Sequence, residues 1–281
     1  MQADDGEALT RRELACVAAE ATTPGISEES LYLNDSVINF YLVLVRRRLR
    51  NPRIVIFSTF MFQSLTRTDD ALVYDFSKVK RWSLWERGKQ LTGNAECGAI
   101  DRVFVPINIP EFPKHWVFVI VDNRQQTIKY FDSFMHAGRP QYFERHTANV
   151  RSYIDDQRRA YAQAPSNSRQ LALFDFASHH YGASIAECPA QRNGFDCGLF
   201  MLKMIAHELT NASSACDFAQ GDMPPVPEQF LLGPATIQPT SLELSPPPYP
   251  SPTSHPRPPP PRPHGTLPNV LKAAPNLSSP R

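Results

Sequence analysis

A chain of 281 residues with a formal net charge of +1 gives no indication of bulk nucleic-acid binding. Of its 27 prolines, 19 lie between Pro224 and Arg281, in a stretch with too few large apolar residues to offset the entropy cost of folding. We therefore divide the chain into a polar lead-in at 1–26, one folded domain at 27–222 and a disordered proline-rich tail at 223–281.

The cysteines and the apolar runs indicate the compartment. Five scattered cysteines without a CxxC pair argue against a disulfide framework and against a structural zinc site, and we expect neither metal nor cofactor. The N-terminal stretch lacks the apolar core of a signal peptide, and no apolar run is long enough to cross a membrane. These features favour the nucleus and/or cytoplasm, where a reducing environment keeps a thiol free for chemistry.

In chain order, the first predicted element is a helix. Apolar residues recur at the spacing of one helix face, at Ile38, Tyr41, Leu42, Val45 and Leu49. Asn34 and Asp35 are candidate N-caps, and the Asn51-Pro52 pair ends the helix. The basic run Arg46–Arg50 suits the negative end of the helix dipole, with a nuclear-localisation signal as the alternative.

Strand-like runs and two further helices complete the domain. The apolar runs lie at Val103–Ile109, Trp116–Val121 and Thr127–Phe131. The polar stretch 122–126 joins the last two runs into a hairpin. Helical patterns then span Gln141–Ala162 and Cys197–Leu209, the second directly after an Asn193-Gly194 turn. This order indicates an α+β domain with a central, mostly antiparallel sheet flanked by helices.

Cys197 is the candidate nucleophile. A turn delivers the chain into a helix at this residue, and the free N–H groups and positive dipole end of a helix favour a thiolate. An unperturbed thiol, with a pKa of about 8.5, is mostly protonated near neutral pH, so this placement matters for reactivity. Gly198 leaves out a side chain where a substrate backbone would approach. The alternative is an inert cysteine buried at the start of a core helix.

His115 is the candidate base, with Asp132 to orient it. His115 opens one strand of the hairpin, and Asp132, 17 residues later, follows the other strand. Antiparallel pairing brings these two ends together, so that a carboxylate lies beside an imidazole. Gln191, six residues before Cys197, and the backbone N–H of Cys197 are candidate oxyanion donors. For His115 alone, the alternative is an ordinary residue at a strand end.

Several ordered blocks together resemble the Ulp/SENP family of SUMO-specific cysteine proteases, peptidase family C48. The blocks are Tyr32–Tyr41, Lys80–Trp82, Asp101–Asn108, His115-Trp116, Asp132 and Gln191–Gly198. The resemblance covers about residues 27–222 and implies a papain-like, adenain-type α+β fold. It also implies that His115, Asp132 and Cys197 form a catalytic triad, with Gln191 in the oxyanion hole.

The resemblance further implies a narrow tunnel in which two aromatic rings clamp the C-terminal Gly-Gly of the substrate. Trp116 matches one ring, and Tyr32 stands where the family usually has a second Trp. Two facing rings leave no room for a Cβ atom, which would explain a preference for glycine.

The implied function is a thiol protease and isopeptidase that matures and deconjugates SUMO or a related ubiquitin-like protein. We expect it to act as a monomer, with no nucleic-acid or membrane partner. Three alternatives stay open: a protease directed at NEDD8 or ubiquitin, an acetyltransferase on the same fold, and a non-catalytic binding module.

The end of the domain departs from the family pattern. Pro224, Pro225 and Pro227 prevent the closing helix that the family has at this point, because proline lacks an N–H donor and clashes inside helices. Either the domain closes without it, Glu228–Leu232 is a remnant, or the gene end is mispredicted. Two tail segments, Pro246–Tyr249 and Arg257–Pro263, match ligands of WW and SH3 domains, with a plain linker as the alternative.

Overall fold

The structure is a computed structural model. It describes residues 9–10, 13–18, 25, 27–49, 51, 53–66, 73–80, 100–110, 114–134, 140–163, 173–174, 176–210, 216 and 218–222. The predicted disorder of 223–281, the two tail motifs, the remnant at 228–232 and residues 81–82 of the Lys80–Trp82 block all lie outside this part.

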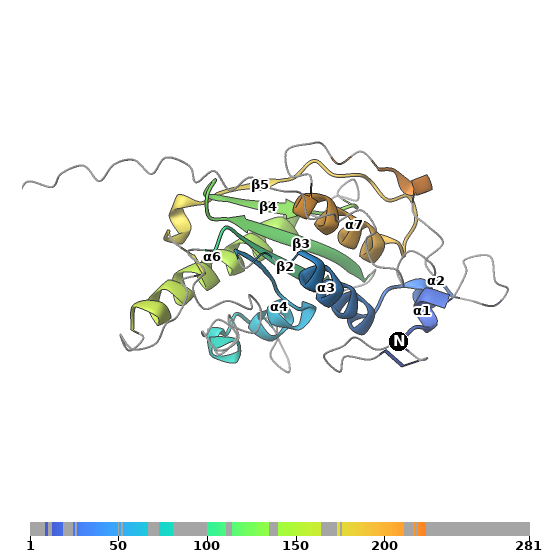
Figure 1. The fold of residues 1–281 in the computed structure, drawn as a ribbon, viewed down its shortest axis with the longest axis horizontal. Helices are drawn as coiled ribbons and strands as arrows, with labels where there is room; N and C mark the ends of the chain where they lie inside the picture. Colours follow the sequence, from blue (N-terminus) through green and yellow to red (C-terminus); the bar gives the residue numbers. More distant parts are fainter. Residues whose placement is uncertain are drawn as a thin grey trace, which may run out of the picture. The chain divides into compact units, whose positions relative to one another are not determined.

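A five-stranded sheet in the order β1-β2-β3-β4-β5 forms the centre of the fold (Figure 1). The strands are β1 Ile54–Ile56, β2 Arg102–Ile109, β3 His115–Asp122, β4 Thr127–Phe131 and β5 Gly182–Ile185. The pairs β2–β3 and β3–β4 are antiparallel, whereas β1 and β5 add to the two edges in parallel. The predicted α+β fold is confirmed, and its two edge strands make the sheet mixed.

The central strand β3 separates two hydrophobic cores. Its sequence is a nearly continuous apolar run, as expected for a strand that is covered on both faces. Because side chains alternate along a strand, Trp116 and Phe118 enter one core while Val117 and Val119 enter the other. The site described below lies at the start of this strand, where it is rigidly held from both sides.

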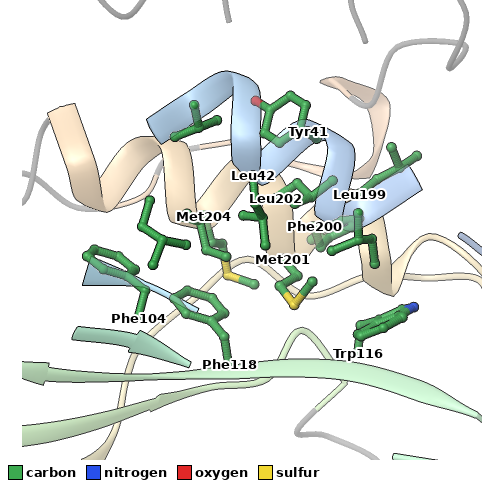
Figure 2. Packing of buried hydrophobic residues seen from close by; sticks show 14 of the residues in the cluster. Tyr41, Leu42, Phe104, Trp116, Phe118, Leu199, Phe200, Met201, Leu202 and Met204 are labelled. Atoms are coloured by element: carbon green, nitrogen blue, oxygen red, sulfur yellow. The ribbon is translucent and has the colours of Figure 1, made fainter. Parts of the chain in front are cut away.

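Helices cover both faces of the sheet. They are α1 Ala15–Ala18, α2 Glu28–Leu31, α3 Asp35–Leu49, α4 Thr59–Thr66, α6 Pro140–Ala162 and α7 Cys197–Thr210, with 3-10 turns η1 Phe76–Lys78, η4 Ser178–His180 and η5 Gln220–Asp222. Helices α3 and α7 contribute to the core that holds Phe118, and α4 and α6 to the opposite one. Figure 2 shows Met201 and Met204 between α7 and the strand residues Phe104 and Phe118.

The first long helix begins where the sequence predicts. The Oδ1 atom of Asn34 accepts a hydrogen bond from the backbone N–H of Val37 at 3.0 Å, so Asn34 caps α3. The Nδ2 atom of Asn34 donates to the carbonyl oxygen of Glu13 at 2.8 Å, and Cys16 of α1 is buried in the same core. The described part of the lead-in therefore contacts the domain.

Among the described helices, none is both long enough and apolar enough to cross a membrane. The four cysteines in the part of the chain that the structure describes, Cys16, Cys188, Cys197 and Cys216, are free thiols. No cluster of His, Cys, Asp and Glu suited to a metal ion occurs among the described side chains.

Candidate active site

His115 and Asp132 meet at one end of the β3–β4 hairpin. The register pairs Phe118 with Phe131, so the start of β3 lies beside the end of β4. The Nε2 atom of His115 is 2.6 Å from the Oδ1 atom of Asp132, and the two residues are only 4% and 3% exposed. The backbone N–H of Phe134 donates to the same Oδ1 atom at 2.8 Å. The carboxylate is thus fixed, and it leaves Nδ1 of His115 free to face another group.

That other group is the thiol of Cys197. Cys197 is the first residue of α7 and is fully buried. Its side chain lies close enough to the His115 ring to act on its pKa, so the structure brings together all three residues of the predicted triad. At this helix end, the backbone N–H of Cys197 has no partner within the helix. The N–H group and the helix dipole both favour negative charge at this point.

The pKa of His115 is raised to about 9 by its neighbours. Burial by itself lowers this pKa, because it disfavours the charged ring. The hydrogen bond that His115 donates to Asp132 and the interactions of the ring with Cys197 outweigh burial. The arrangement therefore favours a protonated His115 ring beside the sulfur of Cys197.

A second thiol lies close to the site but in a different environment. The Sγ atom of Cys188 donates a hydrogen bond to the backbone carbonyl of Asp132 at 3.2 Å. Burial raises the pKa of Cys188 to about 11, so this thiol is protonated near neutral pH. Of these two neighbouring cysteines, only Cys197 contacts the imidazole.

The side-chain amide of Gln191 is held in one orientation. Its Nε2 atom donates to the carbonyl oxygen of Asn193 at 2.8 Å, and its Oε1 atom accepts from the hydroxyl of Ser133 at 2.6 Å. A carbonyl oxygen can only accept, so the NH₂ group must face the turn before Cys197. Sequence reasoning missed Ser133, whose only signal was a small hydroxyl residue directly after Asp132.

The two predicted tunnel residues lie face to face. The rings of Tyr32 and Trp116 have centroids 6.4 Å apart and an interplanar angle of 22°. The indole N–H of Trp116 donates to the carbonyl oxygen of Leu33 at 2.8 Å, which fixes that ring. The hydroxyl of Tyr32 is buried without a hydrogen bond of normal geometry. Burial and, second, the nearby Cys197 raise the pKa of Tyr32, so its hydroxyl stays neutral.

Gly198 also has a packing role that the sequence did not reveal. A Cβ atom at this position would lie 3.0 Å from Cβ of Leu33 and 3.2 Å from Cδ1 of Trp116. The missing side chain therefore makes room for the protein's own residues. It lets the start of α7 approach the segment that carries Tyr32.

A pocket of about 340 Å³ opens next to the aromatic pair. Its lining includes Tyr32, Asp35, Gln63, Lys114 and Arg145. Lys114 directly precedes His115 in the sequence, while the three triad residues are not part of the pocket lining. Its lining carries both signs of charge, which suits a polar protein surface better than an apolar small molecule.

Comparisons with known proteins place this geometry in a family. Residues 31–224 match the Ulp1 protease family, C-terminal catalytic domain. Ubiquitin-like-specific protease 1A of Arabidopsis thaliana is 33% identical over 181 residues, which is 62% of this chain and 31% of that protein. Human sentrin-specific protease 2 is 30% identical over 196 residues, which is 69% of this chain and 28% of that protein.

Solved structures share the fold. A SUMO protease Ulp1 with its catalytic cysteine oxidised to a sulfenic acid matches with a TM-score of 0.50 and 21% identity, over 78% of this chain and 91% of that one. A de-sumoylating protease matches with a TM-score of 0.50 and 17% identity, over 74% of this chain and 71% of that one. At these identities the likeness shows the fold alone.

The chain is shorter than its curated relatives. It spans about a third of the first two and half of the third, whose matched shares are 31%, 35% and 50% of their own lengths. The family match nevertheless covers more than half of this chain and includes His115, Asp132, Gln191 and Cys197. This protein therefore belongs to the Ulp1 protease family, peptidase family C48, and carries the catalytic domain of that family of cysteine proteases.

Proposed function

We propose that this domain is a thiol protease and isopeptidase that cleaves after the C-terminal Gly-Gly of SUMO or a related ubiquitin-like protein. The observation that carries the proposal is the buried 2.6 Å contact between His115 and Asp132, with Cys197 on the other side of the imidazole. A base, a residue that orients it and a nucleophile at a helix N-terminus are the parts that acyl transfer by a cysteine requires.

In the proposed reaction, Nδ1 of His115 takes the proton of Cys197. The thiolate attacks the carbonyl carbon of the last glycine, and the resulting oxyanion accepts hydrogen bonds from the Gln191 amide and the Cys197 backbone N–H. The imidazolium then gives its proton to the departing amine, which is a lysine side chain in a conjugate or a peptide nitrogen in a precursor. A water molecule activated by His115 hydrolyses the thioester and frees the thiol.

The ring pair supports a preference for glycine. A peptide between two parallel rings needs about 3.5–4 Å of contact distance on each side, or roughly 7–8 Å in total. The observed centroid distance of 6.4 Å is somewhat smaller, so the rings of Tyr32 and Trp116 must separate slightly to admit a substrate tail. Any Cβ atom would demand a larger separation, and a Gly-Gly tail therefore fits best.

The names of relatives support the substrate class. Curated relatives are called ubiquitin-like-specific and sentrin-specific proteases. On these grounds we place SUMO ahead of NEDD8 and ubiquitin. The mixed charges beside the ring pair, from Asp35, Lys114 and Arg145, would contact the folded body of such a protein as its tail reaches Cys197.

Hydrolysis of fluorogenic C-terminal amides of SUMO, NEDD8 and ubiquitin tests the proposal. The full chain should release the fluorophore fastest from the SUMO substrate, and Cys197→Ser should release it from none of them. A wild-type protein that is folded but cleaves none of the three would refute the proposed function. Faster cleavage of NEDD8 or ubiquitin would keep the protease and correct the substrate.

A further inference from the structure

The loop that leads to the nucleophile is held from outside by Ser133, which bonds its first residue, and by Gln220. This loop, residues 191–196, carries Gln191 at its start and ends directly before Cys197, and we call it the oxyanion loop. Gln220, on η5, accepts a hydrogen bond from the backbone N–H of Arg192 through Oε1 at 2.8 Å. Its Nε2 atom donates to the carboxylate of Asp196. One side-chain amide therefore bridges the two ends of the loop.

The bridge complements bonds that the oxyanion loop makes within itself. The Nδ2 atom of Asn193 donates to the Asp196 carboxylate at 2.7 Å, and its Oδ1 atom accepts from the backbone N–H of Asp196 at 3.0 Å. These bonds shape the turn, but they do not reach Arg192, the residue next to Gln191. In the part of the chain that the structure describes, it is Gln220 that links Arg192 to Asp196.

The position of Gln220 is itself fixed relative to α7. Phe218, two residues earlier, packs on Phe200 of α7 with ring centroids 5.5 Å apart. The ammonium group of Lys203, also on α7, lies 4.6 Å from the centre of the Phe218 ring. These contacts anchor η5 to the helix that carries Cys197, and they do not depend on the Gln220 amide.

We propose that Gln220 is a positioning residue of the oxyanion hole, which together with Ser133 and Asn193 sets the distance between the Gln191 amide and the Cys197 backbone N–H. This inference rests on the proposed function, since it assigns to these two groups the binding of the oxyanion. Oxyanion donors act through placement, and small displacements of catalytic groups cost large factors in rate. Gln220 touches neither substrate nor sulfur and acts only through the loop.

The test separates oxyanion stabilisation from the reactivity of the thiol. A C-terminal aldehyde of the ubiquitin-like protein that the wild type cleaves adds to Cys197 and forms a tetrahedral adduct that needs the oxyanion hole. Iodoacetamide alkylates the same thiolate by displacement of iodide, without any oxyanion. For Gln220→Ala we expect kcat and aldehyde affinity to fall about 10-fold. This loss is smaller than the roughly 10²–10³-fold loss of kcat when an oxyanion donor itself is removed. KM, the iodoacetamide rate and its pH profile should stay unchanged.

Two further variants test whether the effect of Gln220→Ala comes from the lost bridge. Gln220→Glu keeps the size of the side chain and the acceptor for Arg192, but it places a second carboxylate against Asp196, so it should show the same selective loss. Gln125→Ala, in the β3–β4 turn at the opposite end of the hairpin, is the matched control and should behave as wild type.

The outcomes distinguish this inference from the proposed function. Suppose that the wild type cleaves and that Gln220→Ala and Gln220→Glu both keep wild-type kcat and aldehyde affinity. The role proposed for Gln220 would then be wrong, and the proposed function would stand. Equal losses of aldehyde affinity and iodoacetamide rate would also overturn it, because they would mean general damage to α7. A wild type that reacts with iodoacetamide at Cys197 but cleaves no ubiquitin-like protein would instead refute the proposed function.

Discussion

Cys197 differs from the other described cysteines in what surrounds its sulfur. It begins a helix and lies against the imidazole of His115, whereas Cys188 donates its hydrogen bond to a backbone carbonyl. We therefore expect Cys197→Ser to abolish cleavage and to leave binding of the ubiquitin-like protein intact. Turnover and a pull-down with the same substrate measure the two effects. Cys188→Ala is the matched control and should retain activity, and substantial turnover by Cys197→Ser would contradict the assignment of the nucleophile.

The raised pKa of His115 predicts the pH dependence of both activity and stability. In the folded protein this pKa is about 9, against an ordinary value of 6.5. The proton on His115 thus stabilises the folded state fully below pH 6.5, and this stabilisation is lost as the pH rises to about 9. The rate should fall over the same alkaline range, because the imidazolium that protonates the departing amine disappears.

Removal of the sulfur tests the cause of this shift. In Cys197→Ala, the contact and charge that help to raise the pKa of His115 are absent, so an NMR titration of the His115 ring should give a lower pKa than in the wild type. An unchanged titration would mean that Asp132 alone sets the shift and that the thiol does not contact the imidazole.

Gln191 should contribute to the transition state and not to substrate binding. If its amide donates to the oxyanion, Gln191→Ala lowers kcat by roughly 10²–10³, or about 2.7–4 kcal/mol of transition-state stabilisation. Steady-state kinetics separate the two cases, because an effect confined to KM would show that Gln191 binds substrate and transition state equally.

At the scale of elements, the contact between the start of α7 and the Leu33 segment tolerates no additional atom. Gly198→Ala would place a Cβ atom 3.0 Å from Cβ of Leu33, an atom that cannot move without its backbone. Overpacking of this kind costs about 1–3 kcal/mol, so the midpoint of urea unfolding should fall. The variant should also lose activity, because Cys197 shifts with the helix.

Gly182→Ala provides the control for this substitution. Nothing lies within 4 Å of a Cβ atom at Gly182, which is in the exposed edge strand β5. Its free energy of unfolding should therefore stay within about 0.5 kcal/mol of the wild-type value. Equal effects of the two substitutions would show that the packing around Gly198 is not tight.

The sequence predicts the elements that have a long hydrophobic pattern or a helix-capping residue. Helix α3 has an apolar face and the Asn34 cap, and the β3–β4 hairpin has two apolar runs around a polar turn, so both are found with nearly the predicted bounds. Strand β1 is apolar and buried but has only three residues, and β5 is exposed throughout, so neither shows the long hydrophobic pattern that predicts a strand. Their pairing depends on neighbours that are distant in the sequence.

The same distinction holds within the site. The hairpin brings His115 and Asp132 together by local geometry, which a sequence can reveal. Ser133 and Gln220 act on residues of the oxyanion loop that are 58 and 28 positions away from them, and such contacts exist only in the folded chain. The steric role of Gly198 likewise depends on Leu33, which approaches it only through tertiary packing.

At the scale of the whole molecule, the described catalytic domain ends at η5 with Asp222, and the family match ends at residue 224. A protein truncated after Met223 keeps Phe218 and Gln220 and should remain soluble and active, as size-exclusion chromatography and turnover will measure. If this protein fails to fold, residues beyond 223 supply part of the domain.

The central claim is that the sulfur of Cys197 attacks the C-terminal glycine of a ubiquitin-like protein. The most direct measurement is the reaction of the full chain with SUMO that carries an electrophile in place of its terminal carboxylate. We expect a single covalent adduct by intact mass, mapped by peptide analysis to Cys197 and absent in Cys197→Ser. An adduct on another cysteine would contradict this claim. So would the absence of any adduct with SUMO, NEDD8 and ubiquitin probes, if Cys197 of the same protein still reacts with iodoacetamide.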